Sequence, residues 1–171
     1  SRVIAKRFNN KFCKEKPLFE EPKALLTKVL RLQGLDGDKM SKSRGNSIML
    51  KSTREEVINV VKKAKTDSER FITFDPENRP DVARLLTLIS LTSGRNEVDV
   101  ANDIGNGGAK MLKDMLVESV DKFLTPIRKR REELENNPEK IKEILFRGVD
   151  KAREEATKTL VEVRKVMNMC I

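Results

Sequence analysis

Residues 108–131 read GAKMLKDMLVESVDKFLTPIRKRR, and this stretch predicts one long amphipathic helix. Its apolar residues recur three or four positions apart, which places them on one helical face. Pro126 lacks an amide hydrogen and therefore predicts a kink near Lys122. The face expected to point inward consists of Met111, Leu112, Met115, Leu116, Val120, Phe123, Leu124 and Ile127.

Two further helices are predicted just before this stretch. One carries Val82, Leu85, Leu86 and Ile89 on a single face, and Gly94 is expected to end it in the left-handed conformation. A short helix over residues 96–103 is expected to end at Gly105. Beyond the polar segment 66–80, the sequence therefore predicts helical structure.

The C-terminal part of the chain also predicts helices. Asn137 followed by Pro138 is typical of an N-cap with proline at the first helical position. Gly148 is expected to end or bend the helix that starts there. The last helix is expected to bury Val149, Ala152, Ala156, Leu160, Val163 and Met167.

The first 65 residues have a weaker pattern. Residues 2–12 predict the end of an amphipathic helix. A short apolar stretch fits either a buried strand or one helical turn, and its residues are Leu25, Leu26, Val29 and Leu30. Ser52 and Glu55 form a capping-box pattern that opens another helix. Residues 66–80 contain two prolines and predict a linker or an ordered loop, so we place a domain boundary near residue 66.

Composition limits the function classes. The chain of 171 residues has a formal net charge of +9, and the surplus of lysine and arginine lies mainly in residues 1–70, which favours polyanionic partners such as nucleotides or RNA. It contains no histidine, and Cys13 and Cys170 form no CxxC pair, so we expect no protein-ligated metal. This cysteine usage favours a reducing, cytoplasmic setting, and no apolar run predicts a membrane span.

The motif with the clearest chemistry is Lys39-Met40-Ser41-Lys42-Ser43, which lies between Gly37 and Gly45. Two ammonium groups three residues apart can reach one triphosphate, and the hydroxyl groups can complete an anion site. When pyrophosphate leaves ATP, negative charge grows on it, and ammonium groups that meet this charge lower the barrier. We predict Lys42 and Lys39 as catalytic residues, and Lys39, Met40, Ser41, Lys42 and Ser43 as the ATP-binding set. A solvated loop without a role is the alternative.

The sequence around this motif resembles the second signature of class I aminoacyl-tRNA synthetases, over residues 35–48. The resemblance extends over essentially the whole chain and is greatest to bacterial-type tryptophanyl-tRNA synthetases. The stretches that carry it are residues 1–9, 63–69, 74–77, 85–94, 124–131, 152–156 and 163–167. Tyrosyl-tRNA synthetases share the loop, but residues 66–68 and 85–94 favour the tryptophan enzyme.

This resemblance implies a fold that is mainly α. Residues 1–65 would be the C-terminal remnant of a Rossmann-type α/β catalytic domain with the KMSKS loop, and residues 66–171 a helical anticodon-binding bundle. It also implies ATP with Mg²⁺ as substrate, tRNA(Trp) and tryptophan as partners, and a homodimer. The family's His-Ile-Gly-His-like signature is absent because the chain has no histidine. We therefore expect the isolated chain to be inactive and a missing N-terminal half to complete the tryptophan and ATP sites.

A basic run just past Pro126 is the candidate tRNA contact, and it consists of Arg128, Lys129, Arg130 and Arg131. Contact with tRNA phosphates or the anticodon loop and an ordinary charged helix end are both compatible with it. Three alternatives to a tryptophan–tRNA ligase stay open at this point. They are a non-catalytic tRNA-binding or RNA-binding helical module, part of a tyrosyl-tRNA synthetase, and a structural helical protein with an accidental motif.

Overall fold

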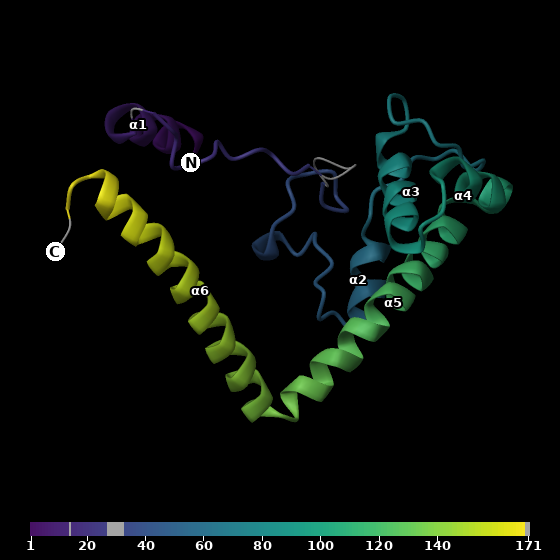
Figure 1. Ribbon diagram of the computed structural model, residues 1–171. Helices are drawn as coiled ribbons and strands as arrows, with labels where there is room; N and C mark the ends of the chain where they lie inside the picture. The colour runs from purple at the N-terminus through teal and green to yellow at the C-terminus, as the bar shows by residue number, and fades with distance from the viewer. Residues whose placement is uncertain (14, 27–32, 170–171) are drawn as a thin grey trace. The chain divides into compact units, whose positions relative to one another are not determined.

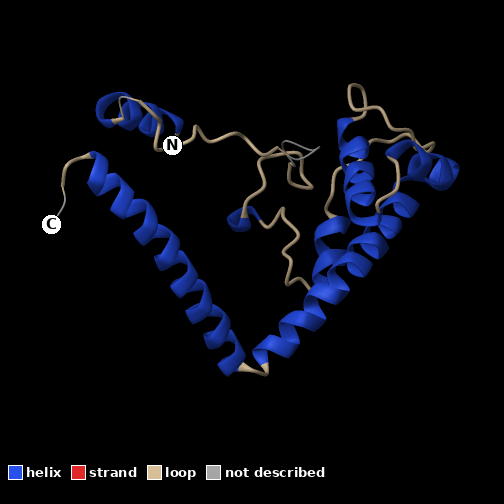
Figure 2. Cartoon of the chain, viewed as in Figure 1, coloured by secondary structure: helices blue, strands red, loops and turns tan. Residues whose placement is uncertain are grey.

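The computed structural model describes residues 1–13, 15–26 and 33–169, and in these residues the fold is mainly α with no β-strand (Figure 2). The prediction of a mainly helical chain is thus confirmed. Within these described ranges, none of the helices is both long and apolar enough to cross a membrane. In chain order the elements are α1 (Arg2–Phe12), η1 (Lys42–Arg44), α2 (Arg54–Lys62), α3 (Pro80–Ser93), α4 (Glu97–Ile104), η2 (Gly105–Gly107), α5 (Gly108–Glu135) and α6 (Pro138–Val166).

The chain divides into two compact units, which are described separately. Residues 31–135 form one, here called the central unit, and residues 1–30 with 136–171 form the other, the terminal unit. In the central unit α3 and α2 both pack against α5, and α4 packs against α3 (Figure 1). The side chains that are less than 2% exposed are Ile72, Leu85, Leu86, Ile89, Leu112, Leu116, Val57, Val61, Val82 and Val100. Each side chain of this size stabilises the fold by roughly 1.5–3 kcal/mol when fully buried.

The core of the central unit contains residues from both sides of the predicted boundary. Val57 and Val61 of α2 belong to the same apolar cluster as Leu112 and Leu116 of α5. The boundary near residue 66 thus runs through one packed unit, and the division at that position stays a prediction.

Arg79 orders the segment between α2 and α3, where the sequence allows a linker or an ordered loop. Its side chain is only 7% exposed. Its guanidinium donates to both carboxylate oxygens of Asp67, at 2.7 and 2.8 Å, and to the Phe71 carbonyl at 2.7 Å. A further bond of 2.9 Å joins it to the Thr73 hydroxyl. These bonds lower the pKa of Asp67 and raise the pKa of Arg79. Residues 67–79 therefore form an ordered loop.

The start of α2 differs by one residue from the prediction. Thr53, rather than Ser52, is the N-cap, and its hydroxyl accepts from the Glu56 amide at 3.2 Å. The Glu56 carboxylate accepts in return from the Thr53 amide at 3.0 Å, which completes the capping box. Ser52 is instead buried, with its hydroxyl accepting from the Met49 amide at 3.3 Å.

Three other predicted helix ends are confirmed. Gly94 ends α3 in the left-handed region at φ 76°, where residues with a Cβ are strained. Gly105 follows the last residue of α4. Asn137 caps α6 by accepting from the Lys140 amide at 3.1 Å, with Pro138 at the first helical position.

Helix α5 confirms the predicted long helix and corrects its inward face. Leu112, Leu116, Val120 and Leu124 are buried, and Met115 and Ile127 pack against the core. Met111 and Phe123 are 43% and 45% exposed, so their predicted burial is wrong. Phe123 keeps the helical spacing of the buried residues, so its exposure shows that burial also needs a neighbouring surface that covers the side chain. Pro126 lies inside the helix, and the kink near Lys122 stays a prediction.

Helix α6 contradicts the expected burial of its apolar residues and one of the two outcomes expected for Gly148. It runs through Gly148 as one helix of 29 residues, so Gly148 does not end it. No side chain of α6 is buried, so the predicted burial of its apolar residues is also wrong. Val149, Val163 and Met167 are half-buried, whereas the predicted core residues Ala152, Ala156 and Leu160 are exposed. The helical period of these residues is present, but burial also needs a covering surface.

The N-terminal part of the terminal unit confirms the predicted helix over residues 2–12 as α1. Asn9 anchors the segment that follows, because its side chain accepts from the Leu18 and Phe19 amides and donates to the Phe19 carbonyl. Leu25 and Leu26 are exposed and belong to neither a strand nor a helical turn, so that expectation is wrong for them. The expectations for Val29, Leu30 and Cys170 lie outside the described residues.

A candidate phosphate-binding loop

The lysine-rich motif lies in a loop of the central unit that closes on itself. Its ends are joined because the Leu35 amide donates to the Asn46 carbonyl at 3.1 Å. A tight turn precedes the motif, with the Gly37 amide donating to the Gly34 carbonyl at 3.0 Å and the Gly34 amide donating to the Asp38 carbonyl at 2.8 Å. Gly37 has φ 90°, a conformation that favours glycine. The motif is therefore presented by a closed loop of about one dozen residues.

The second half of the motif forms the short 3₁₀ turn η1. The Arg44 amide donates to the Ser41 carbonyl and the Gly45 amide to the Lys42 carbonyl, both at 3.3 Å. Gly45 ends the turn at φ 64°. The hydroxyl groups of Ser41 and Ser43 are hydrogen-bonded to each other at 2.8 Å. The two predicted serines, which flank Lys42 in the sequence, are thus in contact through their hydroxyl groups.

Leu35 attaches the loop to the core. Leu35 is 4% exposed and belongs to the apolar cluster of the central unit. Its carbonyl accepts from the Lys65 amide at 3.2 Å, just after α2. A small cavity of about 120 Å³ lies between the loop and α2, and Asp36, Asn46, Val60 and Lys63 are among the residues that line it.

Lys39 and Lys42 are exposed, as the prediction of a phosphate contact requires. Among the described residues, neither lysine has a carboxylate within ion-pair distance. Arg44 differs, because its guanidinium lies 3.1 Å from the Asp38 carboxylate. Two ammonium groups therefore stay available for an anion on this loop, while the neighbouring arginine charge is partly neutralised.

The amide side chain of Asn46 lies under the motif. Asn46 is not among the site residues predicted from the sequence. It is 5% exposed and bonds to Asp36, Lys39 and Ser41. Its hydrogen bond is the main reason why the pKa of Asp36 lies below the ordinary carboxyl value. No signal in one sequence marks this residue, because its partners are identified only by the loop conformation.

The four predicted tRNA-contact residues lie near the C-terminal end of α5 and differ in environment. Lys129, Arg130 and Arg131 are exposed, and the two arginines bond to Glu133 and Glu135 on the same helix. Such exposed pairs within one helix stabilise it by only about 0.3–0.5 kcal/mol, so they open easily for another anion.

Arg128 is used inside the protein. Its guanidinium donates to the Asp121 carboxylate and carbonyl and, at 3.2 Å, to the Ser52 carbonyl. This ion pair lowers the pKa of Asp121, to which Arg54 also donates at 2.9 Å. Arg128 therefore ties α5 to the segment between the loop and α2.

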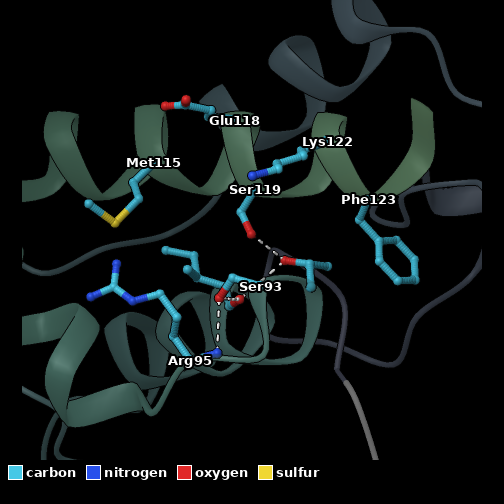
Figure 3. A pocket seen from close by; sticks show the side chains of 9 residues that line it. Ser93, Arg95, Met115, Glu118, Ser119, Lys122 and Phe123 are labelled. Carbon is cyan, nitrogen blue, oxygen red and sulfur yellow. Dashed lines mark hydrogen bonds between the residues drawn. The ribbon is translucent and has the colours of Figure 1, made fainter. Parts of the chain in front are cut away.

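A larger cavity of about 490 Å³ lies between α3 and α5 (Figure 3). Figure 3 shows Arg95, Lys122 and Glu118 around it with the exposed side chain of Phe123. The Thr92 and Ser119 hydroxyls share a bond of 2.6 Å across its floor. None of the predicted site residues lines this cavity, so its size does not bear on the phosphate-binding loop.

The known proteins that match this chain fall in one family. The family model described as tRNA synthetases class I (W and Y) matches residues 1–125. A tryptophan–tRNA ligase of Aquifex aeolicus is 40% identical over 99% of this chain and 43% of its own length. That of a Nostoc species is 33% identical over 98% of this chain and 52% of its own length. The chain spans about half the length of these curated relatives.

Solved structures agree with this match. A tryptophanyl-tRNA synthetase of Mycoplasma pneumoniae has a TM-score of 0.79 over 99% of this chain and 52% of its own, and at 24% identity it shows the fold alone. A tryptophanyl-tRNA synthetase of Campylobacter jejuni, solved with ADP and tryptophan, is 28% identical with a TM-score of 0.68. It covers 98% of this chain and 52% of its own.

Proposed function

Because the chain belongs to the class I tRNA synthetases for tryptophan and tyrosine, we propose that it is the C-terminal part of a tryptophan–tRNA ligase. The observation that carries this proposal is the exposed pair Lys39 and Lys42 on a closed loop, within a chain that matches tryptophan–tRNA ligases almost from end to end. Residues 1–65 are assigned to the end of a Rossmann-type catalytic domain and residues 66–171 to a helical anticodon-binding domain. This division rests on likeness to the family.

In the proposed reaction, the tryptophan carboxylate attacks the α-phosphorus of ATP, which enters with Mg²⁺ as substrate. The bond from the α-phosphorus to the bridging oxygen breaks, tryptophanyl-adenylate forms, and pyrophosphate leaves. Lys42, with Lys39, places positive charge where the leaving group gains negative charge, which lowers the barrier more than it tightens ATP binding. Met40, Ser41 and Ser43 complete the proposed ATP site. A hydroxyl group of tRNA(Trp) then attacks the carbonyl carbon of tryptophanyl-adenylate, the bond from this carbon to the phosphate oxygen breaks, and AMP leaves.

Lys129, Arg130 and Arg131 are the proposed contacts to tRNA, because their charges are exposed and weakly paired. Arg128 belongs to the same predicted set. Its bonds to Asp121 and Ser52 support a structural role, in which Arg128 holds in position the helix α5 that carries the three exposed residues. Replacing these three exposed residues by alanine tests the proposal. It should weaken tRNA binding and make the slope of log K against log salt shallower by about 2–3, because each lost phosphate contact removes about 0.7–0.9.

The rest of the enzyme is part of the same proposal. The upstream half would supply the tryptophan pocket and the opposite wall of the ATP site, and two copies would form the homodimer expected from the family. We also propose a cytoplasmic setting for the enzyme, as expected from the cysteine usage. The chain by itself is expected not to catalyse amino-acid-dependent exchange of pyrophosphate into ATP.

The test joins this chain to the segment that precedes the matching region in the Aquifex aeolicus ligase. The joined protein should catalyse ATP–pyrophosphate exchange with tryptophan and not with tyrosine. Charging of tRNA(Tyr) in place of tRNA(Trp) by the joined protein would identify a tyrosyl enzyme instead, because this chain supplies the proposed tRNA-binding domain. A joined protein that binds tRNA but exchanges pyrophosphate with neither amino acid would favour a non-catalytic tRNA-binding module.

A further inference from the structure

Asn46 holds the two halves of the lysine-rich loop together. Its Nδ2 donates to both Asp36 carboxylate oxygens, at 2.9 and 3.0 Å, and to the Lys39 carbonyl at 3.2 Å. Its Oδ1 accepts from the Ser41 amide at 2.8 Å. Both ends of the amide are therefore used, and the backbone on each side of Met40 is bonded to one side chain.

The space around this amide is closed. Asn46 is 5% exposed, although the residues of the motif above it are mostly exposed. A Cβ placed on Gly34 would lie 2.4 Å from Asn46 Nδ2, so only glycine leaves room for the amide at that position. Because this side chain is enclosed and has four bonds, it has little freedom to take another rotamer.

The negative charge of the Asp36 carboxylate requires a hydrogen-bond donor, such as an amide, at position 46. The Asp36 carboxylate receives two of the Asn46 bonds, and hydrogen bonds to an ionised group are roughly twice as strong as neutral ones. An aspartate at position 46 would have the same shape but would set two carboxylates against each other. It would also lose the donor to the Lys39 carbonyl.

We propose that Asn46 is a positioning residue for the leaving-group step, which fixes the backbone of Lys39 and Ser41 so that the ammonium groups of Lys39 and Lys42 meet the departing pyrophosphate. This inference rests on the proposed function of the loop. Asn46 itself does not touch the nucleotide. Its contribution is made through the lysines and should disappear when they are absent.

The experiment uses the joined protein described above and two asparagine-to-aspartate changes. Asn46→Asp removes the amide under the loop. Asn78→Asp makes the same chemical change in an exposed turn, where the Asn78 side chain donates to Asp75 at 2.7 Å. Tryptophan-dependent exchange is measured for both, each with and without Lys42→Ala. Cleavage by trypsin after Lys39, Lys42 and Arg44 reports on the loop without reference to activity.

Asn46→Asp should lower kcat about tenfold or more, with a smaller change in the KM for tryptophan, since the lost bonds act in the transition state. Trypsin should cut its loop several times faster than the Asn78→Asp loop. In the Lys42→Ala background Asn46→Asp should lower kcat little further, because residues that act as a unit are not additive. The reciprocal swap Asp36→Asn with Asn46→Asp keeps an amide–carboxylate pair and the Ser41 contact but not the bond to the Lys39 carbonyl, so it should recover part of the lost kcat.

Several results would overturn the inference. One is that Asn46→Asp and Asn78→Asp have the same kcat and the same rate of loop cleavage by trypsin, although Lys42→Ala still lowers kcat. Another is that Asn46→Asp lowers kcat by the same factor in the Lys42→Ala background as in the protein that keeps Lys42. Global unfolding of Asn46→Asp would make Asn46 a residue of the general fold, which also contradicts the proposal. By contrast, a Lys42→Ala protein with unchanged kcat would contradict the proposed function of the loop itself.

Discussion

Replacing Arg79 by methionine should destabilise the central unit strongly, because the side chain is buried and bonded on all sides. The change removes two bonds to the Asp67 carboxylate and one each to the Phe71 carbonyl and the Thr73 hydroxyl. Methionine fills much of the volume but donates no hydrogen bond. Asp67 would keep its charge and the hydrogen bond from the Glu69 amide, but it would lose its cationic partner.

The expected loss follows from these contacts. Breaking a buried ion pair by removing one partner costs about 3–5 kcal/mol. The Asp67 side chain is 33% exposed, so water can replace part of the lost bonding at that end. We therefore expect the free energy of unfolding to fall by about 3 kcal/mol, near the lower end of that range.

The matched control is Arg95→Met. Arg95 pairs with Asp103, but its side chain is 44% exposed, and exposed ion pairs contribute only about 0–1 kcal/mol. Urea denaturation followed by far-ultraviolet circular dichroism measures both, since the chain has no tryptophan or tyrosine for fluorescence. A loss below about 1 kcal/mol for Arg79→Met, or one equal to that of Arg95→Met, would refute the reasoning.

Three further predictions concern pH, glycines and tRNA binding. The pKa values of Asp67 and Asp121 are held low by Arg79 and Arg128, so the folded chain binds protons less readily than the unfolded chain. Stability from these pairs is fully present at pH values well above the unfolded pKa of about 3.9 and is lost as the pH falls from that value through the lower folded pKa. Urea midpoints measured across this range should fall less in the Asp67→Asn, Asp121→Asn double variant. Gly94→Ala should cost about 1 kcal/mol because Gly94 has φ 76°, whereas Gly148→Ala in α6 should stabilise by about 0.5–1 kcal/mol. Thermal unfolding that moves in the same direction for both glycine variants would contradict this. In a filter-binding titration with salt, Lys129→Ala should weaken tRNA binding more than Lys151→Ala, and equal weakening would contradict the contact assignment.

Elements with a strong local signal were predicted well from the sequence. Helix α3 and its end at Gly94 follow from the apolar period and a glycine where the left-handed region is needed. The cap of α2 was wrong by one residue because Ser52 and Thr53 both carry hydroxyls, and Glu55 and Glu56 both lie three residues further on. Only the backbone turn decides between the two registers.

Features that depend on a surface far away in sequence were not predicted. The period of α6 is helical, but the exposure of Leu160 depends on what covers the helix. Arg79 reaches Asp67 across 12 residues of loop, and no spacing rule links them. The lysine motif can be identified from its residues alone. The role of Asn46 can be inferred only from the folded loop, in which its side chain bonds to the backbone of Lys39 and Ser41.

The most direct test of the central claim is the kcat of tryptophan-dependent exchange in the joined protein with Lys42→Ala. Lys51→Ala is the control, since Lys51 is exposed and lies nine residues further along the chain. We predict that Lys42→Ala lowers kcat about 100-fold while the KM for ATP changes much less, because the ammonium acts mainly on the leaving group. A kcat for Lys42→Ala equal to that for Lys51→Ala would contradict the account.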